Sequence, residues 1–190
     1  SLRERDISYA EFSQSYDPIP GLDRNLEIQR FEFERKTPGH VAAIGEEPMP
    51  PRTRRAVASA LRRLYPEFKT QGLEESLRLL WRNNESYARI SPPERIARAL
   101  WALQQAHRRD GVFLDLERTT EPGHGQESRL LFAVANPPET GFLAQVMEVF
   151  NRLAIAVRRA YCLQVTTEEI PYLLGSFYVE TQAGEAIQRD

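Results

Sequence analysis

The chain has 190 residues, enough to bury a hydrophobic core in one domain or in one domain with an extension. Its formal net charge of −2 gives no overall attraction to nucleic acid or to a membrane, so we expect neither as a partner. The single cysteine excludes an intrachain disulfide and fits a reducing cytoplasm, the expected location. The chain begins at Ser1 without methionine, and we expect it to be a fragment of a longer protein.

Residues 1–50 are expected to form an N-terminal arm that includes a β-hairpin. The first 25 residues are polar with scattered aromatic residues, which is typical of an arm or loop. Residues 26–35 carry apolar side chains at a spacing of two with one change of parity, which predicts a strand with a bulge. The turn at Pro38-Gly39 would lead into a hairpin partner at residues 41–44.

Three helices are predicted between residues 51 and 109, because apolar residues recur there at helical spacing. The first ends before Pro66 and the second contains Leu77, so residues 51–90 are interpreted as a helical segment. The third begins at Ser91-Pro92-Pro93-Glu94, which has the residue types of a capping box. Gly111 follows its last turn and can supply a left-handed cap.

Residues 91–181 are predicted to form an α+β, ferredoxin-like sandwich, followed by a tail or linker at 182–190. Strands are expected at 112–119, 128–136, 155–165 and 172–180, with a helix at 142–153. The segments 128–136 and 172–180 are apolar on both parities and should be central, whereas the other two alternate and should be edges. The predicted order is therefore 112–119, 128–136, 172–180, 155–165.

Two helices, 142–153 and 92–109, would cover this four-stranded antiparallel sheet. Because helix 92–109 precedes the first strand, the arrangement would be permuted. The face opposite helix 142–153 is a candidate contact surface for the N-terminal unit or for a second copy of the chain. It is predicted to carry Phe113, Ala156, Ala160 and Cys162.

The turn between strand 128–136 and helix 142–153 is the best candidate binding site. A helix N-terminus offers free backbone N–H groups and a positive dipole end, which suit the carboxylate of an amino-acid effector. The alternative is an ordinary turn in which Asn136 or Thr140 caps the helix. The candidate effector-binding residues are Asn136, Pro138, Glu139, Thr140, Gly141 and Phe142.

Other residue groups favour structural interpretations, and no catalytic residue or metal ligand is predicted. The arginines between 52 and 63 are interpreted as a solvated helix face, and the aromatic residues of 175–179 as core rather than an RNA-binding strand. The three histidines show no metal-ligand spacing with each other or with Cys162, which is expected to be a small sheet residue. The carboxylate pairs at 74–75 and 168–169 are typical of a solvated surface.

Two stretches carry a resemblance to known families. The turn from Val134 to Val146 resembles the signature of ACT-type regulatory modules, in which a proline- and glycine-containing turn leads into a helix. Residues 151–163 and 171–179 resemble the non-catalytic N-terminal region of large bacterial NAD-dependent glutamate dehydrogenases. Residues 87–97 resemble the segment that precedes ACT units in those enzymes and in nitrogen-control uridylyltransferases. The resemblance covers about residues 85–180.

The resemblance implies a regulatory and assembly module of a larger enzyme, in contact with other domains of the same polypeptide, in a homo-oligomer. That enzyme would oxidise glutamate with NAD, but no cofactor is expected in this fragment, which has no G-x-G-x-x-G segment. NAD would bind in a catalytic domain beyond it. Two alternatives stay open: a purely structural subunit-packing domain without a ligand, and a free-standing small enzyme on a ferredoxin-like scaffold.

Overall fold

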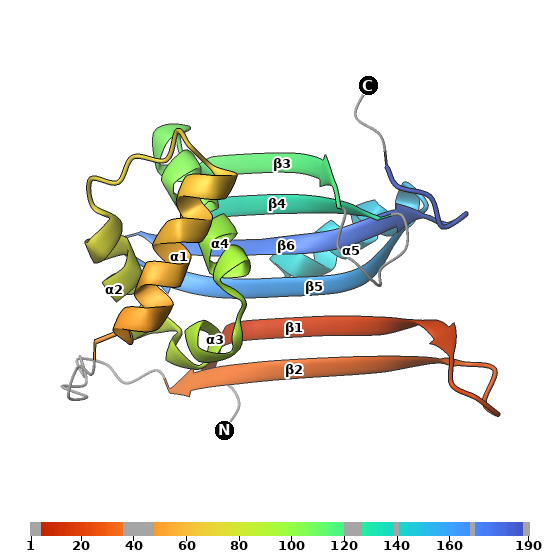
Figure 1. Ribbon diagram of the computed structural model, residues 1–190. Helices are drawn as coiled ribbons and strands as arrows, with labels where there is room; N and C mark the ends of the chain where they lie inside the picture. The colour runs from red at the N-terminus through yellow and green to blue at the C-terminus, as the bar shows by residue number, and fades with distance from the viewer. Residues whose placement is uncertain (1–4, 36–47, 120–126, 139–140, 168–169, 188–190) are drawn as a thin grey trace.

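The computed structural model describes residues 5–35, 48–119, 127–138, 141–167 and 170–187. Within these residues, six strands form one antiparallel sheet in the order β2-β1-β5-β6-β4-β3 (Figure 1). The strands are β1 (Arg5–Pro18), β2 (Asn25–Arg35), β3 (Val112–Arg118), β4 (Ser128–Ala135), β5 (Ile155–Thr166) and β6 (Pro171–Thr181). The helices are α1 (Pro51–Leu64), α2 (Leu73–Asn83), α3 (Glu85–Ile90), α4 (Pro93–Arg108) and α5 (Phe142–Arg152).

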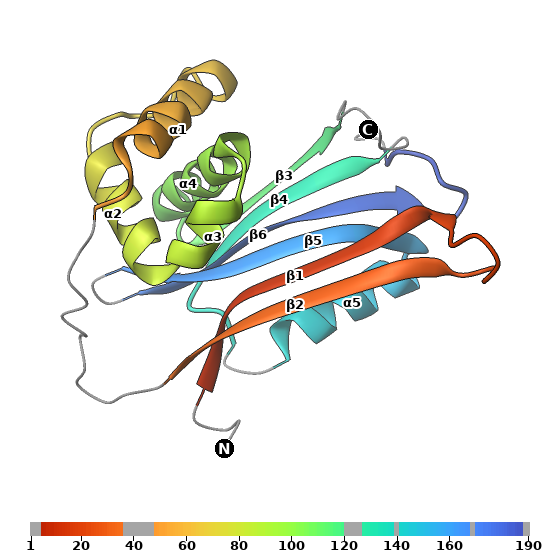
Figure 2. The same ribbon diagram turned by 60° about the horizontal axis from the view of Figure 1, so that its bottom comes forward.

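The predicted ferredoxin-like sandwich is wrong. The order of its four strands, β3-β4-β6-β5, is confirmed, but the sheet continues through β1 and β2. Strand β5 is therefore not an edge, because residues 159–163 pair with residues 9–13 of β1. The two expected covering helices also lie on opposite faces, with α4 on one and α5 on the other (Figure 2).

Helices α1–α4 gather over one end of one sheet face (Figures 1 and 2). Helix α4 lies between the sheet and α1, and it is buried on most sides because Ala97, Ala99 and Ala102 let neighbouring elements approach closely. Ile96, Leu100 and Tyr87 complete this larger core with Leu174 of β6. None of the helices in the described ranges is long and apolar enough to cross a membrane.

Helix α5 covers the other face with a smaller core. Phe150 meets the ring of Phe177 edge-on, with centroids 5.3 Å apart, and Phe177 stacks on Phe132 at 5.1 Å. Gly175 lies in the middle of β6 because a Cβ there would come within 2.7 Å of the Phe132 ring and would clash with the carbonyl of Tyr161. The aromatic residues of 175–179 are buried, as the core interpretation predicted.

Most predicted elements are confirmed, and the differences are local. Pro92 rather than Ser91 is the N-cap of α4, and no side chain caps that helix, so the capping-box prediction is wrong. The helix ends at the C-cap Arg109, and Asp110, with φ of 52°, is the first left-handed residue after it. Gly111, the predicted left-handed cap, follows with φ of 90°, and its N–H donates to the Ala106 carbonyl at 2.9 Å. The expected arm at 1–25 instead contains the whole of strand β1, which pairs with β2. The predicted hairpin partner at 41–44 lies outside the described residues.

The assignment of residues to faces was partly wrong. Phe113 faces the α1–α4 side, but Ala160 and Cys162 belong to the core beneath α5. The cause is a β-bulge between Val157 and Arg159, which moves every later residue of β5 to the opposite face from the one that strict alternation gives.

Candidate functional site

The predicted effector site is the turn between β4 and α5, in which Asn136, Pro138 and Gly141 are exposed. Asn136 adopts a left-handed conformation with φ of 48°, and its N–H donates to the Pro171 carbonyl at 2.8 Å. Gly141 is the N-cap of α5 with φ of 78°, and no side chain caps the helix. Both conformations suit their residue types, because asparagine and glycine tolerate positive φ best.

The remaining members of the predicted site do not converge on a ligand position. Pro138 is exposed, and Phe142 packs its ring against the core beneath α5. Glu139 and Thr140 lie outside the described residues. Effector binding at this turn stays a prediction that rests on the helix N-terminus.

A second feature, which the sequence did not indicate, is a row of charged residues on the α1–α4 face, most of them buried. We call it the arginine–tyrosine cluster. It comprises Glu117, Glu127, Arg129, Arg158, Arg159, Tyr178 and Glu180. Arg129 pairs with Glu117 of the neighbouring strand, and Arg159 pairs with Glu127. The cluster lies on the part of this sheet face that α1–α4 do not cover.

Tyr178 lies between the two buried arginines. The guanidinium carbon of Arg159 is 3.9 Å from the centroid of the Tyr178 ring, and that of Arg129 is 5.8 Å away. Such cation–π contacts gain strength when the groups are removed from water, and all three side chains are buried here. The tyrosine ring thus separates the two positive charges and interacts favourably with each.

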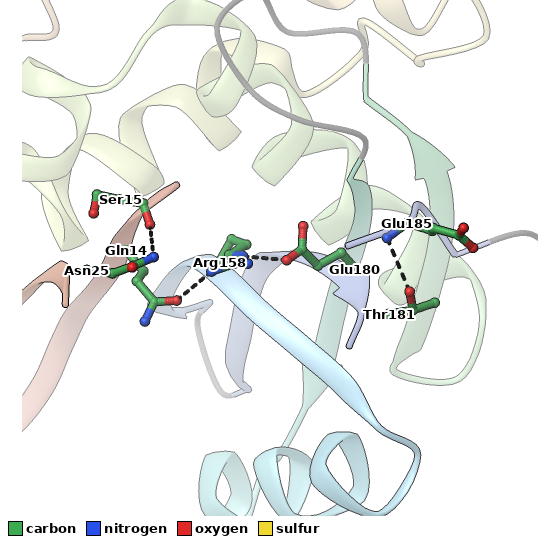
Figure 3. A network of polar contacts seen from close by, with 7 residues as sticks. All are labelled: Gln14, Ser15, Asn25, Arg158, Glu180, Thr181 and Glu185. Atoms are coloured by element: carbon green, nitrogen blue, oxygen red, sulfur yellow. Dashed lines mark hydrogen bonds and ion pairs between the residues drawn. The ribbon is translucent and has the colours of Figure 1, made fainter. Parts of the chain in front are cut away.

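Arg158 extends the cluster to the N-terminal hairpin (Figure 3). Its guanidinium donates at 2.5 Å to Glu180 of β6 and at 3.0 Å to the amide oxygen of Gln14 of β1. The bulge in β5 makes this possible, since it places two consecutive arginines, Arg158 and Arg159, on the same side of the sheet.

Arg129 and Arg159 of the cluster stay charged despite their burial. Burial lowers the pKa of Arg159, but the hydrogen bond and the charge of Glu127 outweigh it and raise that pKa above its ordinary value. The pKa of Arg129 is also raised, because its hydrogen bond with Glu117 outweighs the effect of burial. Three arginines against three glutamates leave the cluster neutral overall, which fits a positioning role better than attraction of a charged ligand.

A neighbouring aromatic group ties α3 to the hairpin and α4 to β5. The Tyr9 ring of β1 lies 5.3 Å from the Tyr87 ring of α3, and the Tyr9 hydroxyl donates to Glu11 at 3.1 Å. The guanidinium of Arg95, from the first turn of α4, lies 3.6 Å above the Tyr161 ring. Burial raises the pKa of Tyr87 and Tyr161, so both phenols are neutral hydrogen-bond donors at ordinary pH.

Cys162 is fully buried beneath α5, and burial raises the pKa of its thiol to about 12. A protonated, inaccessible thiol is a poor nucleophile, which agrees with the structural role predicted for it. His107 lies at the exposed end of α4, while His40 and His124 lie outside the described residues. In the described ranges, no three His, Cys, Asp or Glu side chains are grouped so that they could hold a metal ion.

The basic residues of α1 are exposed, in agreement with the solvated face predicted for them. Two of them form surface ion pairs: Arg54 with Glu74 at 3.0 Å, and Arg63 with Glu94 at 2.6 Å. These pairs join α1 to α2 and to α4.

The sheet also has apolar side chains at its surface. On the hairpin, Leu26, Ile28 and Phe31 of β2 are 47%, 55% and 49% exposed. At the opposite edge, Val112 and Leu114 of β3 are about equally exposed. The sequence analysis predicted from its alternation that β3 is an edge strand, and the described sheet confirms this, because β3 is last in the strand order.

Comparison of the chain with protein-family models, with curated proteins and with solved structures found no match. The resemblance to glutamate dehydrogenases therefore rests on the sequence motifs alone.

Proposed function

We propose that this chain is a non-catalytic assembly module, one that joins protein subunits or domains, within a larger NAD-dependent glutamate dehydrogenase. The sequence stretches 151–163 and 171–179, which form most of β5 and β6, support the choice of parent protein. The chemistry of glutamate oxidation would take place in a catalytic domain outside this chain, where NAD would bind.

The observation that carries the assembly function is the exposed apolar surface of strand β2. Leu26, Ile28 and Phe31 of this strand are 47%, 55% and 49% exposed. Apolar surface of this kind leaves water when a protein partner covers it, which favours association.

The arginine–tyrosine cluster supports the same function. It connects the hairpin to β6 through Arg158, whose part-buried guanidinium donates to Glu180 of β6 and to Gln14 of β1. A binding surface that is tied to the sheet in this way loses less conformational entropy when a partner binds.

Regulation by an amino-acid effector at residues 136–142 is the second candidate function. The uncapped N-terminus of α5 and the left-handed Asn136 and Gly141 support it. The unfolding temperature distinguishes effector binding from purely structural packing, because a ligand that binds the folded state raises that temperature. A panel of the twenty amino acids and 2-oxoglutarate tests it: a rise lost in Gly141→Trp supports the effector site, and no rise at millimolar ligand contradicts it.

The assembly function is tested by mixing this chain with the separately expressed remainder of the glutamate dehydrogenase. We expect the two to co-elute in size-exclusion chromatography, and we expect NADH formation from glutamate to require the remainder. A chain that does not associate with the remainder, or that forms NADH by itself, contradicts the proposal. The matched control is the remainder with an unrelated domain of similar size.

A further inference from the structure

We propose that the outer face of helix α1 binds an acidic segment of a partner protein through Arg52, Arg55 and Arg62. This inference rests on the assembly function proposed above, and it names the chemistry of the partner's surface. These three arginines and Ser59, which lies among them, are called the α1 arginine stripe.

The stripe is one continuous, exposed face of the helix. Its four positions follow each other at spacings of three, four and three residues, so their side chains share a face. All four are exposed, whereas Val57 and Leu61 of the same helix are buried against its neighbours. Helix α1 lies on the far side of α4 from the sheet, in the outer layer of the molecule (Figure 2). At a rise of about 1.5 Å per residue, the stripe is about 15 Å long.

The charge of α1 is not balanced within the helix. It carries five arginines and no acidic residue. Arg52, Arg54 and Arg55 lie among its first five residues, where the positive end of the helix dipole disfavours cations. Arginines three or four residues apart also repel each other. Such a local cost without a gain inside the helix is typical of a functional surface.

Two arginines of the same helix show which chemical group suits this surface. Arg54 pairs with Glu74 of α2 at 3.0 Å, and Arg63 pairs with Glu94 of α4 at 2.6 Å. For the stripe, the described part of the chain gives one hydrogen bond, in which Arg62 Nε donates to the Ala58 carbonyl of its own helix at 3.3 Å. The planar guanidinium groups of the stripe can therefore donate to carboxylates of a partner.

The surroundings of the stripe favour an acidic protein segment over a nucleic acid. Arg54 and Arg63 lie on its two flanks, so their partners Glu74 and Glu94 border it on both sides. A nucleic acid carries a phosphate at every nucleotide and would bring several of them against these glutamates, and the net charge of −2 gives no wider attraction. A protein segment can place carboxylates on the stripe and neutral residues beside the glutamates.

Peptide binding tests the chemistry of the surface. The probe is a fluorescein-labelled peptide of ten glutamates, and a labelled single strand of ten thymidines is the comparison. Fluorescence anisotropy should show that the peptide binds more tightly than the oligonucleotide. Raising the salt from about 50 mM to about 300 mM should weaken peptide binding at least about fivefold, because exposed ion pairs are screened.

Exchange of the arginines tests the location. The stripe variant is Arg52→Gln/Arg55→Gln/Arg62→Gln. It should weaken peptide binding about tenfold or more, since each exposed ion pair contributes roughly twofold to fivefold. Glutamine is a good helix former, and thermal unfolding should show that the fold persists. The control variant removes the same charge from exposed positions outside α1 and should change binding less than about twofold. It is Arg24→Gln/Arg108→Gln/Arg118→Gln.

The same two variants, mixed with the remainder of the dehydrogenase, connect the stripe to assembly. The stripe variant should need about tenfold more remainder than the control variant to co-elute in size-exclusion chromatography. The proposal is overturned by a peptide that does not bind, by an oligonucleotide that binds more tightly, or by two variants with equal effects. If the stripe variant binds the remainder as well as the wild type does, this proposal fails and the assembly function stands. If the wild type binds the peptide but not the remainder, the assembly function is the one that fails.

Discussion

At the scale of single residues, the ion pair between Arg159 and Glu127 places two full charges out of contact with water. Glu127 is fully buried and Arg159 is 6% exposed. Two such charges attract each other strongly, but each also loses its hydration, so the pair as a whole adds little net stability. Removing one partner is different, because the remaining charge is left buried without its counter-ion.

We therefore predict that Glu127→Gln lowers the free energy of unfolding by about 3 kcal/mol, or the unfolding temperature by about 6–12 °C. The double variant Glu127→Gln/Arg159→Met should recover a large part of this loss, because it removes the stranded charge. Urea unfolding followed by circular dichroism measures both. Glu94→Gln, which breaks the exposed pair with Arg63, is the control and should cost about 0.5 kcal/mol or less. A small effect of Glu127→Gln would contradict the prediction.

The sequence could not reveal this cluster, because its members are far apart in the chain and a bulge decides which of them meet. Under strict alternation, Arg158 and Arg159 would lie on opposite faces, as the sequence analysis assumed for β5. In the structure Val157 pairs with Val179 and Arg159 pairs with Tyr178, so β5 has one more residue than β6 at this point. Because of this extra residue, both arginines reach the same face. No residue type marks the position, since glycine is absent from β5.

At the scale of elements, the strand that the sequence analysis missed is β1. Its side chains are mostly polar or half-buried, and Tyr9 is the one residue of known burial in β1 that is fully buried. A two-sided polar strand has little hydrophobic periodicity, so it resembles a loop in sequence. The strands with strong patterns, β4 and β6, were predicted to within one residue at each end.

The short pairing between β1 and β5 predicts how the hairpin moves. Strand β1 pairs with β5 over residues 9–13, whereas β6 pairs with β5 from Pro171 to Thr181. We expect the β1–β2 hairpin to open as a unit before the other four strands do, since it has fewer ladder bonds and less buried apolar surface to lose. Native-state hydrogen exchange should show the amides of β1 and β2 exchanging faster than those of β4 and β6. Arg158→Ala should accelerate the hairpin alone, and equal protection of all six strands would contradict this.

At the scale of the whole molecule, the sequence contained the information that both faces of the sheet are covered. Strands β4 and β6 are apolar on both parities, and such strands occur where both faces are buried. A four-stranded sandwich with both helices on one face would leave the apolar side chains on the other face of β4 and β6 without a cover. The structure resolves it, with α4 packed against Leu131 and Leu174 on one side and α5 near Phe132 and Phe177 on the other. The turn site gained no further support, because two of its residues lie outside the described ranges.

The α1–α4 face also predicts how the protein responds to alkali. Burial raises the pKa of Tyr65 to about 12, and burial likewise raises the pKa of Tyr9, Tyr87 and Tyr161 above the ordinary 10.0. In the unfolded chain these phenols lose their protons near pH 10, while in the folded chain they keep them. The unfolded state then binds fewer protons than the folded state, so the free energy of unfolding must fall as the pH rises above about 10. Below that pH the contribution is fully present.

We expect the free energy of unfolding to decline steeply between about pH 10 and pH 12, with Tyr65 alone contributing about 2 kcal/mol of the loss. The arginine pairs should not contribute, since both arginines with a shifted pKa have it raised. Urea unfolding at a series of pH values measures the slope. Tyr65→Phe is the matched variant, because it keeps the stacking on Trp101 at 4.7 Å and removes the ionisable group, so its slope should be shallower. A stability that stays constant to pH 12 would show that the pKa of these phenols is the same in the folded and unfolded chains, and it would contradict the prediction.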